Sequence, residues 1–109
     1  MVAETGKAAV FTATVGEGDY AHALGNPGVH VLATPRLADF CDRAAAQAAG
    51  APTTHIRVDI RHLAATPVGD DVEITAELVE VDGRRLVFSI AGRDSARDIV
   101  SGHVERLTV

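Results

Sequence analysis

Residues 34–62 read TPRLADFCDRAAAQAAGAPTTHIRVDIRH, and within this stretch the spacing of apolar residues changes from helical to extended. Apolar side chains recur at intervals of three and four up to Ala48, which predicts an amphipathic helix. From Thr54 to His62 they alternate with polar ones, which is typical of a strand with one buried face. Gly50 and Pro52 separate the two patterns and end the helix.

Strand-like segments also lie before and after this stretch. The order along the chain is a strand at 8–15, a loop at 16–29, the helix, the strand ending at His62, and three more strands around 72–78, 86–90 and 98–108. Asp82-Gly83 is a strong signal for a two-residue hairpin. Consecutive strands joined by short turns form an antiparallel sheet, and a helix with one apolar stripe packs on a face of it. We therefore predict an α+β fold with one long helix wrapped by a five-stranded antiparallel sheet.

The bulk composition limits the classes of function. The 109 residues fit a single domain spanning 1–109, and a domain this small buries a modest core, which favours oligomerisation. The formal net charge of −5 argues against binding to nucleic acid or to an anionic membrane. No run is long enough to span a membrane, and the single cysteine, Cys41, fits a reducing compartment. We expect a cytoplasmic protein without nucleic-acid or membrane partners.

His62 is the most informative polar residue. Alternation along the strand places its imidazole on the same face as Ile56, Val58 and Ile60, which is the predicted core face. An unpaired polar group there costs about 1–3 kcal/mol, so His62 needs a partner. A core histidine bonded to a carbonyl and a site histidine at the strand end both satisfy this requirement.

Two helix residues are candidates for the same site. Thr34 precedes Pro35, which predicts Thr34 as the N-cap and Pro35 as the first helical residue. The amides of Arg36 and Leu37 are then expected to be unpaired beside the Thr34 hydroxyl, where they could hold an oxyanion. Asp42 follows at the border of the apolar stripe. Capping alone explains Thr34 and a solvated carboxylate explains Asp42, so both alternatives stay open.

Other reactive residue types give weaker signals. Arg106 lies in the last strand, where a surface ion pair is the default interpretation. Cys41 falls on the apolar stripe, which favours core packing over a nucleophile. The histidines at 22, 30 and 55 have no metal-ligand spacing with Cys41, so we predict no metal site.

A longer motif starts at His62. It reads His62-Leu63-Ala64-Ala65-Thr66-Pro67-x-Gly69, continues through Val72, Ile74, Ala76-Glu77-Leu78, Val81 and Gly83-Arg84-Arg85-Leu86, and ends with Asp94, Ile99, Gly102 and Glu105-Arg106. Together with Ala33-Thr34, this pattern resembles the fluoroacetyl-CoA-thioesterase-like branch of the hotdog superfamily. The resemblance needs no gap from His62 to Arg106, whereas the first 30 residues share only the general layout.

The resemblance implies a hotdog fold and a homodimer or a dimer of dimers, with the pocket for the acyl-pantetheine arm between protomers. The family's catalytic set maps onto Thr34, Asp42 and His62, and its pocket arginine maps onto Arg106. His55 and Leu37 are the further residues assigned to substrate binding. Coenzyme A is part of the substrate in this family, so the resemblance implies no separate cofactor.

Two departures from the family pattern bear on activity. The helix carboxylate is usually Glu, and Asp42 is one methylene shorter. A misplacement of about 1 Å can cost on the order of a hundredfold in rate. The fluoroacetyl-selective member has Gly where this chain has His55, so selectivity for fluoroacetyl groups does not transfer.

The predicted function is hydrolysis of a small acyl thioester carried by CoA or by an acyl carrier protein. Thr34 and the helix amides would hold the carbonyl, Asp42 would activate water or attack directly, and His62 would orient water or substrate and shuttle a proton. A non-catalytic acyl-CoA-binding protein is the first alternative, motivated by the shorter Asp42. A hydratase or cyclase is the second. Hotdog hydratases usually carry an Asp-x-x-x-x-His pair within a hydratase motif, and our expectation that this chain has no such pair lowers the second alternative.

Overall fold

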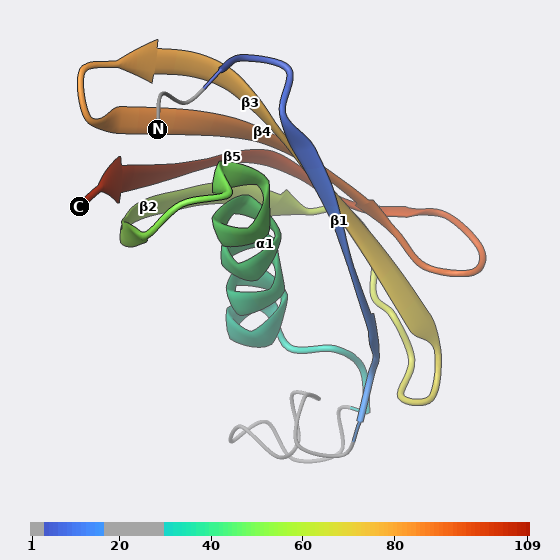
Figure 1. Ribbon diagram of the computed structural model, residues 1–109. Helices are drawn as coiled ribbons and strands as arrows, with labels where there is room; N and C mark the ends of the chain where they lie inside the picture. Colours follow the sequence, from blue (N-terminus) through green and yellow to red (C-terminus); the bar gives the residue numbers. More distant parts are fainter. Residues whose placement is uncertain (1–3, 17–29) are drawn as a thin grey trace.

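A computed structural model describes residues 4–16 and 30–109. Its elements follow the predicted order (Figure 1): β1 Ala8–Thr14, α1 Thr34–Ala49, β2 Thr53–His62, β3 Asp71–Asp82, β4 Arg85–Arg93 and β5 Asp98–Thr108. The predicted loop at 16–29 lies, apart from its first residue, outside the described residues.

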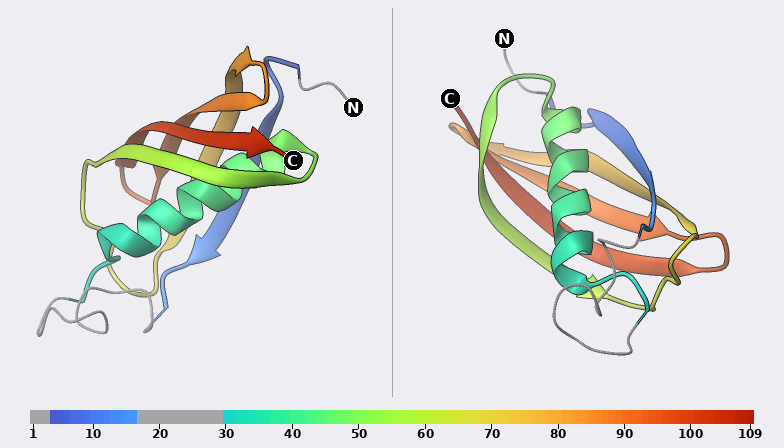
Figure 2. Two further views of the ribbon diagram at one scale, coloured as in Figure 1. Left: turned by 90° about the vertical axis from the view of Figure 1, so that its left-hand side faces the viewer. Right: turned by 90° about the horizontal axis from the view of Figure 1, so that it is seen from below.

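The five strands form one antiparallel sheet in the order β1-β3-β4-β5-β2, so β1 and β2 are its edges. The helix packs across one face of this sheet, which curves around it (Figures 1 and 2). Figure 2 also shows that β2 runs beside α1 in the opposite direction. The predicted α+β architecture is therefore confirmed.

An apolar stripe holds the helix to the sheet. Its buried members are Leu37, Phe40, Cys41, Ala44, Ala45, Ala48 and Ala49. Phe40 also packs on Phe11 of β1, with 5.4 Å between the ring centroids. Gly50 ends the helix in a left-handed conformation, as predicted. In the part of the chain that the structure describes, no helix is long and apolar enough to cross a membrane.

The helix begins one residue earlier than predicted. Ala33 is the N-cap, Thr34 is already helical, and no side chain caps this end. The amides of Arg36 and Leu37 both donate to the carbonyl oxygen of Ala33, at 3.1 and 3.0 Å. The expectations that Thr34 caps the helix and that these two amides are unpaired are therefore wrong, because a backbone carbonyl already accepts them.

The inner faces of the central strands complete the core. The residues predicted to point inward are all buried, namely Val72, Ile74, Ala76 and Leu78 of β3 and Leu86, Phe88 and Ile90 of β4. The hairpin between these strands turns at residues 83–84, one position later than predicted, because Asp82 still pairs with Arg85.

Edge strand β2 contains a bulge that sequence alternation does not reveal. Its register against β5 pairs Arg57 with Glu105 and then His55 with Arg106, which leaves Ile56 as an extra residue. Such a bulge reverses the in–out alternation of the residues before it. Ile56 is 45% exposed, so the prediction that it faces the core is wrong.

A buried polar contact fixes the turn before β3. Thr66 donates its hydroxyl hydrogen to Asp94 at 3.0 Å, and its carbonyl oxygen accepts the N–H of Leu32 at 2.8 Å. Burial alone would raise the pKa of Asp94, but hydrogen bonds from the N–H groups of Ala96 and Arg97 and from Thr66 outweigh it and hold the pKa below its ordinary value. Thr66 thus ties the segment that leads into the helix to the β4–β5 turn.

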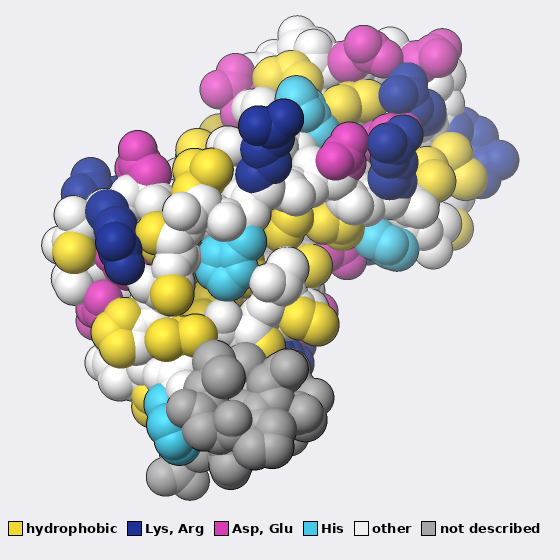
Figure 3. Space-filling view, turned by 180° about the vertical axis from the view of Figure 1, so that it is seen from behind, with side chains coloured by type: hydrophobic (Ala, Val, Ile, Leu, Met, Phe, Trp, Pro, Cys, Tyr) yellow, Lys and Arg dark blue, Asp and Glu magenta, His cyan; other side chains and the backbone are white. Residues whose placement is uncertain are grey.

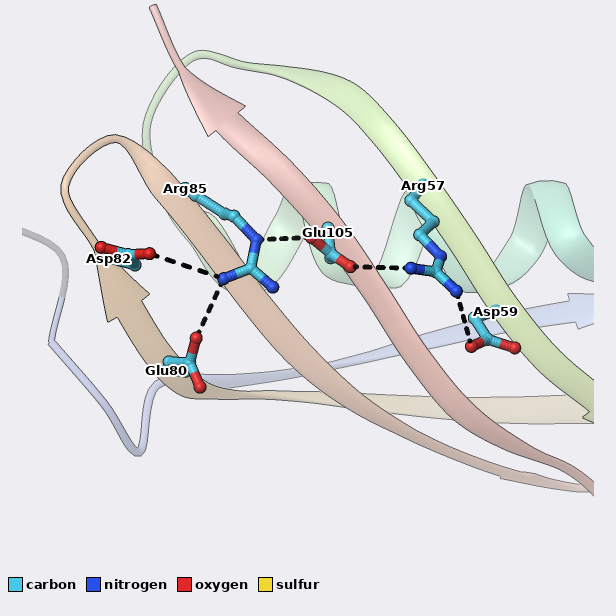
Figure 4. Close-up of polar contacts among 6 residues, drawn as sticks. All are labelled: Arg57, Asp59, Glu80, Asp82, Arg85 and Glu105. Atoms are coloured by element: carbon cyan, nitrogen blue, oxygen red, sulfur yellow. Dashed lines mark hydrogen bonds and ion pairs between the residues drawn. The ribbon is translucent and has the colours of Figure 1, made fainter.

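The face of the sheet away from the helix carries a group of charged side chains among apolar and uncharged ones (Figures 3 and 4). Arg85 donates to Glu105 at 2.6 Å, and Arg57 lies 4.0 Å from the other oxygen of the same carboxylate. The hydrogen bond from Arg85 lowers the pKa of Glu105. Glu105 therefore belongs to this outer face, while the next residue, Arg106, points toward the helix and is buried.

Candidate active site

Thr34 and His62 are in direct contact where the helix begins and β2 ends. The Thr34 hydroxyl oxygen lies 2.9 Å from Nδ1 of His62, although the two residues are far apart in the sequence. Because Ala33 provides the cap, the Thr34 hydroxyl remains available to this contact. We refer to these two residues as the Thr34–His62 pair.

The second ring nitrogen of His62 has an unusual environment. Its Nε2 atom is buried and has no hydrogen-bond partner among the described residues. A buried nitrogen without a partner costs about 1–3 kcal/mol, so such an atom calls for a partner that residues 4–16 and 30–109 do not supply. A substrate carbonyl oxygen or a water molecule would satisfy it.

Asp42 lies further along the helix and forms an ion pair with Arg106. Nη1 of Arg106 donates to Oδ1 of Asp42 at 2.5 Å. The Arg106 guanidinium is anchored from its other side, because Nε and Nη2 donate to the hydroxyl and carbonyl oxygens of Thr53 at 2.7 and 3.1 Å. Arg106 is only 8% exposed, so the default interpretation of a surface ion pair is wrong for this residue.

His55 joins Asp42 from the edge strand. Its Nδ1 atom lies 3.2 Å from the same oxygen, Oδ1, that Arg106 contacts. The bulge at Ile56 produces this contact, because it turns His55 to the helix side of the sheet together with its register partner Arg106. We refer to Thr53, His55, Asp42 and Arg106 as the Asp42 cluster.

The three predicted catalytic residues do not form one constellation within a single chain. Asp42 lies eight residues after Thr34 on the helix, which is a rise of about 12 Å. The Thr34–His62 pair therefore lies where α1 begins and β2 ends, whereas the Asp42 cluster lies between the middle of α1 and the start of β2. The contact of Asp42 with His55 was not predicted from the sequence, since simple alternation sends His55 to the outer face.

Leu37 has a simpler explanation than substrate binding. It is completely buried and belongs to the core beneath the helix, which accounts for its apolar side chain. Its assignment to substrate binding stays a prediction.

Cys41 adds no reactive centre to these two clusters. Cys41 is buried in the core, as predicted, and burial, reinforced by the charge of Asp42, raises the pKa of its thiol to about 12. The expectation that the chain has no Asp-x-x-x-x-His pair is wrong, because Asp98 and His103 have this spacing, but both side chains are exposed. Within residues 4–16 and 30–109, no three His, Cys, Asp or Glu side chains are placed to hold a metal ion.

A cavity of about 780 Å³ lies elsewhere, lined by residues of β1, β3 and the β4–β5 turn, among them Thr12, Asp71, Glu73 and Ser95. Its lining includes none of the predicted site residues.

Comparisons with known proteins identify the family. A family model described as "Fluoroacetyl-CoA-specific thioesterase" matches residues 15–109. The chain belongs to this family. A curated relative, the fluoroacetyl-CoA thioesterase of Streptantibioticus cattleyicolor, is 44% identical over 50 residues, a segment that spans 46% of this chain and 36% of that relative. The matched segment thus covers about a third of the relative's length.

Solved structures extend the likeness over nearly the whole chain. Two variants of the fluoroacetyl-CoA thioesterase FlK, the second in complex with acetyl-CoA, are each 27% identical, with TM-scores of 0.88 and 0.86. The matches cover 98% and 95% of this chain and 88% and 87% of those chains. A hot-dog-like protein from Thermanaerovibrio acidaminovorans (22% identity, TM-score 0.86, covering 96% of this chain and 82% of that one) shows the fold alone. The predicted hotdog fold and the predicted thioesterase family are confirmed.

Proposed function

We propose that this protein hydrolyses small acyl-CoA thioesters as a homodimer, with each active site built from both protomers. The observation that carries the proposal is the position of the two polar clusters at opposite ends of β2, a strand at the edge of the sheet. His55 and His62 are about 20 Å apart along this strand. One chain therefore holds two half-sites.

A two-fold axis through the middle of β2 would unite these halves. When a strand pairs antiparallel with its own copy about its centre, its first residues lie beside the last residues of the copy. His55 of one protomer would then lie within about two residues of His62 of the partner subunit. Both side chains face the helix side in this chain, so they would share one face of the joined sheet.

The exposed residues along this edge fit such a dimer. Ile56 and Leu63 are 45% and 52% exposed in the single chain, and both lie on or next to β2. An edge strand also leaves backbone hydrogen-bonding groups open, and pairing with a second copy satisfies them. Self-association at β2 would therefore bury apolar surface and complete a backbone ladder at the same time.

The chemistry of the two clusters is complementary. The Thr34 hydroxyl and the orphan Nε2 atom of His62 can hold the thioester carbonyl as its oxygen gains negative charge. The Asp42 cluster, facing them from the partner subunit, supplies a carboxylate and an imidazole that can take a proton from the attacking water. In this assignment, side-chain groups hold the carbonyl oxygen in place of the backbone amides of Arg36 and Leu37, which both donate to Ala33.

The substrate class follows from the family and its relatives. The family description names fluoroacetyl-CoA, and the FlK structure contains acetyl-CoA, so a short acyl group on CoA is the first substrate class to test. His55 adds a side chain at the position where the fluoroacetyl-selective member of the family has Gly, which argues against transferring the fluoroacetyl preference. CoA is part of the substrate, and we propose a cytoplasmic site of action without a metal or separate cofactor.

Two heterodimers test the shared site, and each is made by coexpressing differently tagged chains. In the first heterodimer, one chain carries Asp42→Asn and the other carries His62→Ala. The homodimer of either variant alone is expected to be inactive. A shared site leaves one of the two sites intact, so about half of the wild-type turnover of acetyl-CoA is expected.

The matched control places both substitutions in one chain and pairs it with a wild-type chain. A shared site predicts no turnover for this control, because each site then contains one substituted residue. The opposite result, with the control active and the first heterodimer inactive, would show that each chain acts alone. Acyl-CoA that binds to the wild-type dimer without turnover, across acetyl- to decanoyl-CoA and an acyl carrier protein, would indicate a binding protein.

A further inference from the structure

His55 is placed for chemistry by the backbone of β2. The extra residue Ile56 turns its side chain toward the helix, where Nδ1 lies 3.2 Å from Oδ1 of Asp42. About half of the His55 side chain is exposed, so its outer edge faces the space beside the strand. The side chain is thus anchored at Nδ1 and half exposed.

The contact with Asp42 determines which nitrogen carries the proton. An ionised carboxylate only accepts hydrogen bonds, so Nδ1 of neutral His55 must be the donor in this contact. The lone pair of a neutral imidazole then resides on Nε2. A histidine oriented in this way by a carboxylate has the arrangement of a general base in hydrolytic enzymes.

Asp42 itself is less suited to this role. Its Oδ1 atom accepts hydrogen bonds from Arg106 and from His55 together, so this oxygen is already occupied by two donors. Arg106 is held in turn by both oxygens of Thr53. The chain of contacts runs from Thr53 through Arg106 and Asp42 to His55, and each member fixes the orientation of the next.

We propose that His55 is the general base of the thioester hydrolysis and that Asp42 is its positioning residue. This inference rests on the proposed function and changes which residue takes the proton. Nε2 of His55 accepts a proton from water while the water oxygen bonds to the thioester carbonyl carbon. The tetrahedral intermediate then collapses, the C–S bond breaks, and the thiolate takes the proton back from the imidazolium. The products are a carboxylic acid and free CoA.

Substitution of His55 separates this role from a structural one. His55→Ala is expected to lower kcat for acetyl-CoA by about 10²–10⁴-fold while KM changes little, because the lost interaction belongs to the transition state. Added imidazole should restore part of the turnover of His55→Ala, because the His55 side chain is half exposed and free imidazole can take its place. It should not restore the turnover of His62→Ala, because the Nε2 atom of His62 is buried. His55→Gln serves as a second variant of similar size should the alanine variant fail to fold.

His103→Ala is the matched control, because His103 is an exposed histidine on the neighbouring strand β5 and is expected to keep full turnover. A His55→Ala dimer with kcat within about threefold of the wild type would overturn the inference and leave the thioesterase proposal intact. An increase in KM without a change in kcat would also overturn the inference about His55. The same holds for a loss of kcat in both His55 variants that imidazole does not restore. A wild-type dimer that hydrolyses none of the acyl-CoA panel would overturn both proposals.

Discussion

At the scale of single residues, one oxygen of Asp42 receives two partners of different character. Arg106 is buried and always charged, whereas His55 is half exposed and can exchange a proton with water. The short aspartate side chain keeps this carboxylate close to its own helix. A neighbouring imidazole can extend its reach toward the substrate, which offers a physical reason why Asp serves where the family usually has Glu.

Cys41 beside Asp42 gives a stability prediction. Burial and the charge of Asp42 raise the pKa of its thiol from 9.0 to about 12. Between these values the unfolded chain releases the thiol proton and the folded chain keeps it, so the free energy of unfolding falls as the pH rises above 9. We expect this residue to remove about 1.4 kcal/mol of stability between pH 8 and pH 10.

Urea unfolding of the wild type and of Cys41→Ala at both pH values measures this effect. The alanine variant loses packing at both pH values, but its disadvantage should shrink by about 1.4 kcal/mol at pH 10. An unchanged difference between the two proteins would show that the thiol ionises equally well in the folded state.

The sequence named candidate site residues but did not predict all of their contacts. The resemblance to the family selected Thr34, Asp42 and His62, and the structure joins two of them directly. The link between Asp42 and His55 was missed because a bulge shifts the alternation by one residue, and no residue type in β2 marks its position. The cap was assigned to Thr34 because Ala33 has no capping side chain, yet its backbone carbonyl performs that role.

At the scale of elements, the pairing of β5 with β2 supports both clusters. Arg106 of β5 holds Asp42, and Val100 pairs with His62 at the other end of β2. Between them lies Gly102, whose φ of 147° is rarely adopted by other residues. A Cβ atom at this position would lie 2.2 Å from the carbonyl oxygen of Asp59. The two strands therefore approach each other at a point where only glycine fits.

Gly102→Ala is expected to destabilise the fold by about 3 kcal/mol or more, since backbone strain and a clash with the backbone of β2 add together. Gly83→Ala is the control, because Gly83 also has a positive φ of 60° but nothing within 4 Å of the added Cβ. The control should lose only about 1–2 kcal/mol in urea unfolding. Equal losses in the two variants would contradict the close approach of β5 to β2.

The elements themselves were largely readable from the sequence. The helix and all five strands appear in the predicted order, because their apolar spacing matches the faces that the core buries. What alternation cannot supply is local register. The pairing shifts at Ile56, between Leu78 and Glu80, and between Gly92 and Arg93, and the β3–β4 turn lies one residue later than predicted. Only the shift at Ile56 changes the chemistry of the site.

At the scale of the whole molecule, the proposed shared site would make activity depend on association. The Thr34–His62 pair and the Asp42 cluster lie at opposite ends of β2, so a folded monomer lacks a complete site under our proposal. Specific activity should therefore fall on dilution in proportion to the fraction of dimer, and it should reach half of its maximum where half of the chains are monomeric. Mass photometry and acetyl-CoA turnover, measured over the same concentrations, test this dependence.

Two copies fused through a flexible linker provide the control, because their effective concentration does not change on dilution and their activity should stay constant. A monomer that keeps full turnover while its circular dichroism shows an intact fold would contradict a site shared between protomers.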